Sequence, residues 1–321
     1  MQKALLLYNP LSGRGRGRRL RDVNSALSVL RAAGVEAASA PTNHGEVDSQ
    51  VHLAIAEGCD TIFACGGDGT VHDVLQGLVN TDAALALIPL GTANSLAHDL
   101  GIPLSPLRAA QACLAAKPRR IAVGRVEYLD FAGNPTSRYF TVTAGVGVDA
   151  HLFYKLNPAA KRHLGMMAYY VKATRLWLLD RMRQFEIELG AEHQSRRSEV
   201  SQLLAVRIQN FGGVLQELAP GASLQRPDLR LVLFHTRSRA AYLQYVIRGL
   251  LAAQWKVPGI ELLHSDRVRC RALPGSEPRE RVFVEADGEL LGTLPAEISV
   301  IPDALTLLIP GDLGSTSTSV Q

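Results

Sequence analysis

Short, mostly apolar runs alternate with longer segments of helical periodicity over the first part of the chain. Apolar runs of this length are typical of strands that are buried on both faces of a parallel sheet. Each run is followed by a turn and then by a helical segment, which is the order of β-α units. The pattern predicts an α/β domain with a doubly wound, mostly parallel sheet. Its strands are expected at residues 4–8, 35–40, 61–65 and 83–88.

A different pattern begins near residue 121, where apolar residues tend to recur at every second position. Such alternation, with connections containing glycine or proline, indicates a mainly antiparallel β-sandwich. The break at residues 117–120 predicts a boundary between the two patterns. We expect an α/β domain over 1–124, a β-sandwich domain over 125–310 and a flexible tail over 311–321. The predicted sandwich strands are 139–143, 185–189, 203–208, 229–234, 282–285 and 306–309.

Two segments of helical periodicity interrupt these strands, at residues 164–182 and 240–256. Both combine apolar and aromatic residues with basic ones. Basic amphipathic helices with aromatic residues can lie on an anionic membrane surface. The same composition suits ordinary helices that cover a sheet, so both interpretations are kept.

Composition limits the class of protein. The 321 residues suffice for two domains, and a hydrophobic content of 47% with mixed charge indicates a globular protein. The net charge of +4 is too small to predict a nucleic-acid partner, whereas an anionic ligand or membrane surface fits it. We expect a cytoplasmic protein, because the sequence shows neither a signal peptide nor an uncharged run of about 18 residues. The cysteines lack metal-like spacing and are expected to be free buried thiols, at Cys59, Cys65, Cys113 and Cys270.

The strongest candidate for chemistry is the turn after residues 61–65, which reads Gly-Gly-Asp-Gly-Thr over residues 66–70. Glycines allow backbone N–H groups to approach an anion, and the start of the following helix adds further free N–H groups. Open α/β sheets bind nucleotides at this edge. A glycine-rich turn without a ligand is the alternative. The segment is not a Walker A loop, because no Gly-Lys-Ser/Thr follows.

Two further turns at strand ends repeat this arrangement. Residues 9–13, Asn-Pro-Leu-Ser-Gly, lead into alternating arginines and glycines, where Arg14 would suit phosphate oxygens. A solvated, basic helix start is the alternative. Arg18 departs from the Gly-x-Gly-x-x-Gly spacing of dinucleotide sites. Residues 89–94, Pro-Leu-Gly-Thr-Ala-Asn, follow the fourth strand.

The turns at residues 66–70 and 89–94 together resemble those of the diacylglycerol kinase catalytic family, which is related to the sphingosine and ceramide kinases. NAD kinase shares the first turn and differs in the second. Later segments are similar to the family too, so the resemblance covers most of residues 3–310. It implies an ATP-dependent lipid kinase that phosphorylates a hydroxyl of a lipid alcohol, such as diacylglycerol, phosphatidylglycerol or a sphingoid base.

The resemblance also implies the residues that hold the nucleotide. Donors at the strand ends would bind the triphosphate of ATP, and Mg²⁺ bound with the nucleotide would neutralise charge. The lipid kinases contact the nucleotide with a threonine at the place of Thr42, which is otherwise a helix cap. The expected binding residues are Asn9, Ser12, Gly13, Arg14, Thr42, Gly66, Gly67, Asp68, Gly69, Thr70, Gly91, Thr92 and Asn94.

Asp287 is implied as the base that takes the proton of the lipid hydroxyl, with Glu289 as the second choice. The Asp-Gly pair at this position is also a hairpin signal between two strand-like runs. Asp68 completes the expected catalytic set, and catalytic Mg²⁺ is expected near Asp68 and Glu289. Histidines offer no better mechanism, since His72 is expected on the exposed first turn of its helix.

Three positions depart from the family pattern. Bacterial members resemble one another in a second set of acids, which holds a structural Mg²⁺ near the domain junction. Ser95, Ala122 and Arg226 stand at places of those acids here. A carboxylate site does not survive the loss of its acids and the gain of an arginine, so we predict no structural metal there. Arg226 is the candidate for the replacing charge.

The expected partners are a lipid substrate and, transiently, the inner face of the membrane, to which the enzyme would bind peripherally. No nucleic acid is expected, and a homodimer is left open. One alternative is an NAD kinase-like enzyme, against which the Gly-Thr-Ala-Asn segment counts. Another is a nucleotide- or lipid-binding protein that has lost turnover. The altered acids suggest this second alternative, whereas the retained Asp68, Asp287 and Glu289 oppose it.

Overall fold

In the computed structural model the chain forms two compact units. The first combines Met1–Ile121 with Asp303–Gln321, and the second is Ala122–Pro302. Most of the predicted helix at 164–182 and nearly all of the predicted tail lie outside the described residues. The residues that the structure describes are 1–10, 16–43, 45–148, 150, 182–190, 196–212, 218–253, 255–275 and 281–311.

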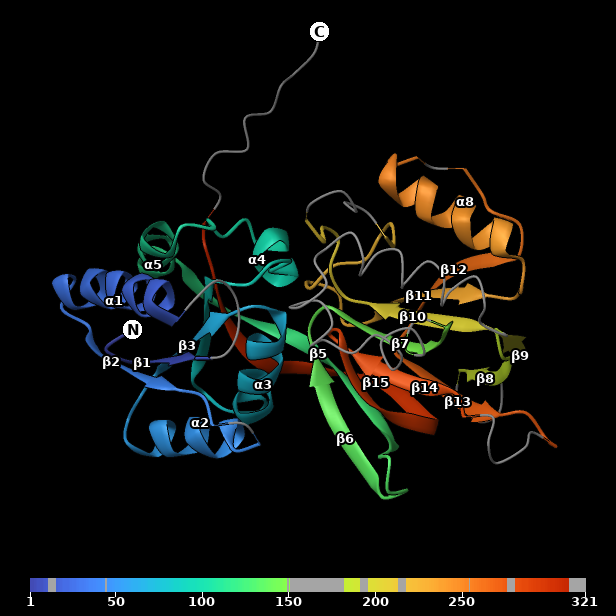
Figure 1. The fold of residues 1–321 in the computed structure, drawn as a ribbon, viewed down its shortest axis with the longest axis horizontal. Coiled ribbons are helices and arrows are strands. Elements are labelled where there is room, and N and C mark those ends of the chain that lie inside the picture. The colour runs from blue at the N-terminus through green and yellow to red at the C-terminus, as the bar shows by residue number, and fades with distance from the viewer. Residues whose placement is uncertain are drawn as a thin grey trace, which may run out of the picture. The chain divides into compact units, whose positions relative to one another are not determined.

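A parallel sheet between helices forms the first unit (Figure 1). The strand order is β2-β1-β3-β4, with the end of β15 beside β4, and each of these pairs is parallel. Helices α1 and α5 cover one face, and α2 and α3 cover the other (Figure 1). The predicted α/β architecture is confirmed. The elements are β1 (Lys3–Tyr8), α1 (Arg16–Ala32), β2 (Glu36–Pro41), α2 (Val47–Ala56), β3 (Thr61–Gly66), α3 (Asp68–Leu78), β4 (Ala84–Pro89), α4 (Ser95–Asp99) and α5 (Pro106–Leu114).

The central strands of this sheet lie in the hydrophobic core of the first unit. β3 and β4 are buried at every position, as their uninterrupted apolar sequences predict. The four cysteines are free and buried, which confirms the prediction. Burial raises the pKa of the Cys113 thiol to about 11, so this thiol is unreactive at neutral pH. Among the described residues, no helix is both long and apolar enough to cross a membrane.

Antiparallel strands of the second unit pack into two apolar clusters among the described residues. A path of neighbouring strands runs β12-β11-β10-β7-β14-β15, and β13, β8 and β9 continue it from β15. α8 lies over β11 and β12 (Figure 1). The elements are β5 (Lys117–Leu129), β6 (Pro135–Phe140), β7 (Thr143–Gly147), β8 (Phe185–Leu189), β9 (Arg196–Val200), β10 (Gln202–Val206), β11 (Leu229–Phe234), α8 (Arg239–Leu250), β12 (Ile260–Ser265), β13 (Arg267–Ala272), β14 (Phe283–Ala286) and β15 (Glu289–Ile309).

The predicted strand at residues 139–143 is wrong as a single element. β6 ends at Phe140 and β7 begins at Thr143. Thr141 and Val142 between them direct their N–H groups to a side-chain carboxylate, that of Asp287, instead of to a neighbouring strand. A buried backbone donor must have a partner, and here a distant acid provides it.

The last strand differs from the expectation that residues 125–310 form one domain. Residues from Asp303 onward return to the first unit, where Thr306 and Leu307 pair in parallel with β4. The expected boundary at residues 117–120 falls inside β5, and the compact units divide after Ile121. Arg120 fastens the returning strand, since its guanidinium donates to the Asp303 carbonyl and the Thr306 hydroxyl.

Candidate active site

The loops after β3 and β4 leave the parallel sheet side by side. The register aligns Gly66 with Pro89, and the Leu90 N–H donates to the Gly66 carbonyl at 2.8 Å. α3 begins at Asp68, so the free N–H groups of its first turn lie at the same edge. Open α/β sheets bind nucleotides at this edge, where N–H groups can contact phosphate.

Close backbone contact explains the glycines of these loops. A Cβ atom on Gly91 would collide with the backbone of Gly67, and one on Gly66 would collide with the side chain of Thr70. Backbone atoms cannot move aside as a flexible side chain can. The packing of one loop on the other therefore requires glycine, independently of any phosphate.

We expect Gly91→Ala to lower both the affinity for ATP and the stability of the protein. Separating the two loops should cost about 1–3 kcal/mol in the free energy of unfolding, the range for overpacked sites. Calorimetric ATP titration and urea unfolding measure the two effects. Gly17→Ala is the matched control, because a Cβ atom there meets open space. Equal ATP affinity in the two variants would contradict the role given to this contact.

Two polar side chains tie the loops together. The Asn94 side chain accepts a hydrogen bond from the Gly91 N–H through Oδ1 at 2.9 Å and donates one from Nδ2 to the Gly91 carbonyl at 3.0 Å. The backbone φ of Asn94 is 51°, in the left-handed region. Asp68 receives the Ser95 N–H, the first of α4, at 2.6 Å. Asn94 and Asp68 thus shape the loops, whichever ligand contacts they also make. Ser95, which stands at a place where the resemblance implied an acid, is buried.

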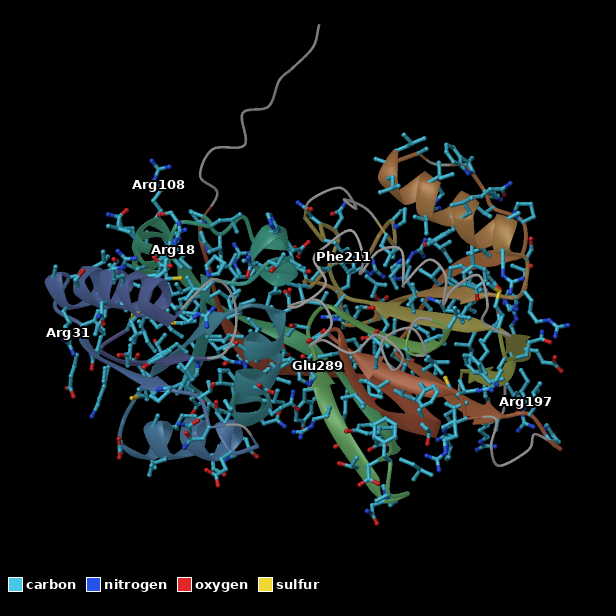
Figure 2. The ribbon with its side chains drawn as sticks, in the orientation of Figure 1. Arg18, Arg31, Arg108, Arg197, Phe211 and Glu289 are labelled. Atoms are coloured by element: carbon cyan, nitrogen blue, oxygen red, sulfur yellow. The ribbon has the colours of Figure 1, made fainter. Side chains whose placement is uncertain are left out.

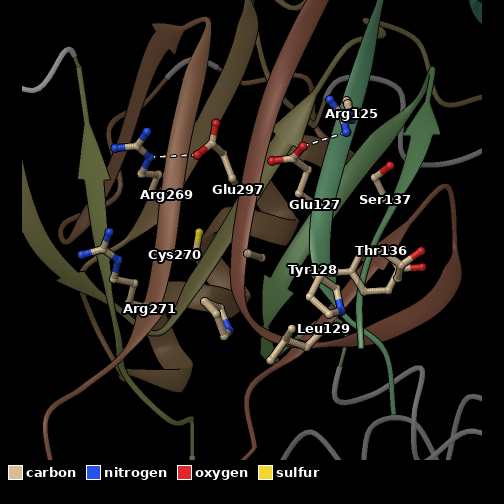
Figure 3. A pocket seen from close by; sticks show the side chains of 13 residues that line it. Arg125, Glu127, Tyr128, Leu129, Thr136, Ser137, Arg269, Cys270, Arg271 and Glu297 are labelled. Carbon is tan, nitrogen blue, oxygen red and sulfur yellow. Dashed lines mark hydrogen bonds and ion pairs between the residues drawn. The ribbon is translucent and has the colours of Figure 1, made fainter. Parts of the chain in front are cut away.

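A recess of about 450 Å³ opens beside the β4–α4 loop. Its lining includes Gly91, Thr92 and two of the three arginines in the first turn of α1, Arg18 and Arg19. Arg19 is buried, donates to the Asn9 carbonyl at 2.7 Å, and has its pKa lowered by burial. Arg18 is exposed at the rim (Figure 2). The volume and the two basic groups suit a phosphate-bearing ligand.

The other predicted binding residues have mixed outcomes. Ser12, Gly13 and Arg14 lie outside the described residues. Thr42 does not cap a helix, because α2 begins after Glu46; its N–H instead donates to the Tyr8 carbonyl at 2.9 Å. Thr42 thereby follows β2 at the same sheet edge as the residue after Tyr8.

Asp287 occupies the tight turn between β14 and β15. Its φ of 49° and the φ of 82° at Gly288 are both positive, as an Asp-Gly hairpin turn requires. The predicted hairpin is confirmed. The carboxylate points into its own unit, is only 7% exposed, and receives the N–H groups of residues 141–143 at 2.9–3.1 Å. These donors fix its orientation.

Glu289 follows on the first position of β15 and is exposed (Figure 2). Asp68 belongs to the first unit and Glu289 to the second, and the structure does not place the units relative to each other. Within the described residues, no group of three or more His, Cys, Asp and Glu could hold a metal. Catalytic Mg²⁺ near Asp68 and Glu289 therefore stays a prediction.

Comparison with known proteins identifies the family. Residues 3–126 match the Diacylglycerol kinase catalytic domain, and residues 142–309 match the YegS C-terminal NAD kinase beta sandwich-like domain. A diacylglycerol kinase of Mycobacterium tuberculosis is 30% identical over 96% of this chain and 95% of its own. The chain belongs to the diacylglycerol kinase family.

Further relatives agree with this membership. A diacylglycerol kinase of Bacillus subtilis is 29% identical over 92% of this chain and 93% of its own. A crystal structure of a diacylglycerol kinase from Bacillus anthracis has the same fold, with a TM-score of 0.72 at 21% identity, over 96% of this chain and 97% of its own. The resemblance found in the two loops is confirmed, as is the sandwich-like second domain.

Membership in the diacylglycerol kinase family makes the protein a lipid kinase, a phosphotransferase with an alcohol group as acceptor, and implies the use of ATP. The similarity to NAD kinase is one of fold, as the description of the second matching family, an NAD kinase beta sandwich-like domain, states.

A buried arginine lies where this kinase family was expected to place metal-binding acids. Arg207 is 0% exposed, and its guanidinium donates to the carbonyls of Ala122, Leu224, Arg226 and Asp228. Burial lowers its pKa to about 10, so the group is still a cation at neutral pH. The structure thus places a cation next to two of the altered positions, Ala122 and Arg226.

Arg226, the expected source of the replacing charge, is engaged elsewhere. Its exposed guanidinium pairs with the carboxylate of Asp228 at 2.6–2.7 Å. Arg207 was not among the predicted site residues, although it is a lone charged residue within the apolar run at 203–208. A charge in a buried strand requires partners, and four carbonyl oxygens provide them.

His72 also differs from the expectation. It is 4% exposed and lies on the buried side of α3, not on an exposed first turn. Thr70 and Val71 on the same turn are buried as well. Residues 70–72 of α3 therefore pack deeply into their unit, whereas residues 67–69 at the β3–α3 turn are partly exposed.

Proposed function

We propose that this protein transfers the γ-phosphate of ATP to the hydroxyl of a lipid alcohol, with diacylglycerol as the first candidate. The names of the relatives supply that candidate. The observation that carries the proposal is the pair of glycine loops packed together at the carboxyl edge of β3 and β4, beside a recess with two arginines. Phosphoryl transfer needs mainly positioning and charge stabilisation, and these elements offer both.

The residues have separable roles in this proposal. Backbone N–H groups at residues 67–69 of the β3–α3 turn and the hydroxyl of Thr92 bind the triphosphate, and Arg18 adds positive charge at the recess. When bound with the nucleotide, Mg²⁺ would neutralise part of the charge of the triphosphate. Asp287 accepts the proton of the lipid hydroxyl, and the donors at residues 141–143 hold its carboxylate in one orientation.

The lipid acceptor is embedded in a bilayer, so the protein would work as a peripheral enzyme on the inner face of the membrane. Such an enzyme needs a surface that binds lipid without crossing the membrane. The absence of a membrane-crossing helix among the described residues is compatible with this placement.

The test is transfer of labelled phosphate from Mg-ATP to diacylglycerol, phosphatidylglycerol and sphingosine in mixed micelles, with NAD as a soluble acceptor. We expect label in one lipid, with diacylglycerol the strongest acceptor. Label in NAD alone would replace the proposal by the NAD kinase reading. ATP binding without transfer to any acceptor would favour a protein that binds and does not turn over.

A further inference from the structure

A second basic recess lies in the other unit, between the end of α8 and the strands below it. It has a volume of about 420 Å³ and is lined by residues of α8, β11, β12 and the segment between α8 and β12. Three basic residues line it, namely Arg230, Arg248 and Lys256, together with Tyr245 and Trp255. None of these residues has a part in the proposed phosphoryl transfer.

Arg248 is buried in this recess without sufficient partners. Only 7% of the residue is exposed, and its Nε and Nη2 atoms have no hydrogen-bond partner among the described residues. Its guanidinium stacks on the Tyr245 ring at 4.5 Å from the centroid. The Nε of Arg230 is likewise buried without a partner in the described part of the chain, and burial lowers the pKa of Arg230. Buried unpaired donors cost free energy, so an anion in the recess would stabilise both groups.

The nearby acids do not neutralise these arginines. Glu261 in the lining already accepts two hydrogen bonds from Arg196, at 2.8 and 2.9 Å, and lies 3.1 Å from His235. Asp228 is paired with Arg226 and His264. Among the described residues, the recess therefore carries net positive charge, and its free donors match the oxygens of a phosphate group.

An exposed apolar stripe runs along α8 beside this recess. Its members recur at helical spacing, so they share one face. The opposite face is fixed to the sheet by Tyr242 and Tyr245, whose rings lie 4.4 and 5.2 Å from that of Phe234. The stripe therefore belongs to a rigid helix. It consists of Leu243, Val246, Ile247, Leu250 and Leu251, which are 39–66% exposed. Trp255, which lines the recess, is 43% exposed.

We propose that this surface docks on an anionic bilayer: the stripe of α8 enters the interface, and the recess of Arg230, Arg248 and Lys256 binds the phosphate of a lipid headgroup. Apolar side chains beside basic ones, with a tryptophan at their edge, are what an interfacial helix presents to anionic lipid. A soluble phosphate would not explain the stripe, and a second copy of the chain would not explain the buried arginine nitrogen atoms that lack partners among the described residues. The site binds lipid whether or not the protein turns over ATP.

The experiment measures binding of the full chain to phosphatidylcholine vesicles with and without phosphatidylserine, a lipid that is not a candidate acceptor. Trp177→Phe leaves Trp255 as the single tryptophan, and brominated lipid then reports its insertion by quenching. We expect binding to require phosphatidylserine and to weaken with salt. Arg248→Gln and Lys256→Gln should each weaken it roughly fivefold, and Ile247→Gln with Leu250→Gln at least about tenfold.

Arg197→Gln is the matched control, since this exposed arginine of β9 lies outside the recess (Figure 2). It should bind vesicles as the unchanged protein does. Circular dichroism checks that Arg248→Gln folds, and Lys256→Gln tests the charge at an exposed position that folding does not require. Equal binding with and without phosphatidylserine, or no quenching of Trp255, would overturn the proposal. So would tight binding of inorganic phosphate alone, or a stripe variant that only converts dimers to monomers in light scattering.

Discussion

Asp287→Asn is expected to lower kcat for lipid phosphorylation about 10²–10⁴-fold, the usual contribution of a positioned general base. Asparagine keeps the side-chain shape and tolerates the positive φ of 49° at this turn. It cannot take a proton from the lipid hydroxyl. The Thr141 N–H donates to Oδ2 of Asp287, and in the variant it would face the NH₂ group of asparagine, which cannot accept a hydrogen bond. The free energy of unfolding should therefore fall by about 2 kcal/mol. Activity must be measured at a temperature at which circular dichroism shows the variant folded.

Glu289→Gln separates the two carboxylates of the hairpin. Glu289 is exposed, so this change should leave the unfolding midpoint in urea unchanged and reduce kcat much less than Asp287→Asn does. The pH dependence of kcat distinguishes a base from a purely structural acid, because only loss of a base removes the acidic limb of the profile. If folded Asp287→Asn kept kcat within about twofold, Asp287 would be a structural residue of the turn.

Arg207→Met is expected to lower the free energy of unfolding by about 3–5 kcal/mol, the range for leaving buried polar partners unmatched. Methionine fills part of the volume but leaves the carbonyls of Ala122, Leu224, Arg226 and Asp228 without this donor. Lysine at this position should restore only part of the loss, because one ammonium group cannot reproduce the fork of a guanidinium. Urea unfolding gives the free energy of unfolding of the unchanged protein and of the methionine and lysine variants.

The matched control for this prediction is Arg226→Gln. Arg226 forms an exposed ion pair with Asp228, so we expect a change within experimental error. Equal losses in the two variants would contradict the special place given to Arg207.

Magnesium removal tests the altered acids by a separate measurement. With a guanidinium beside Ala122 and residues 224–228, a chelator added without nucleotide should leave the thermal unfolding midpoint unchanged. A clear fall in the midpoint, reversed by added Mg²⁺, would show that a structural metal exists and would refute the prediction made from Ser95, Ala122 and Arg226.

Several features followed from the sequence because they depend on neighbouring residues. The buried strands β3 and β4 are predictable because their sequences are uninterrupted apolar runs. The Asp-Gly turn at residue 287 is predictable because few residue pairs accept two positive φ angles. The two glycine loops were likewise visible as motifs, and their family resemblance was confirmed. Periodicity and backbone preference are local properties, so a single sequence carries them.

Other features were decided only by the tertiary structure. The strand at 139–143 breaks because a carboxylate far away in the sequence captures its N–H groups. The end of β15 joins the first unit because the backbone of Thr306 and Leu307 pairs with the edge of β4. In the sequence Arg207 is a single charge within an apolar run, and only folding brings the four carbonyls that accept its hydrogen bonds close to it. In each case a buried polar group or strand edge must find a partner, and only the folded chain determines which distant residue provides it.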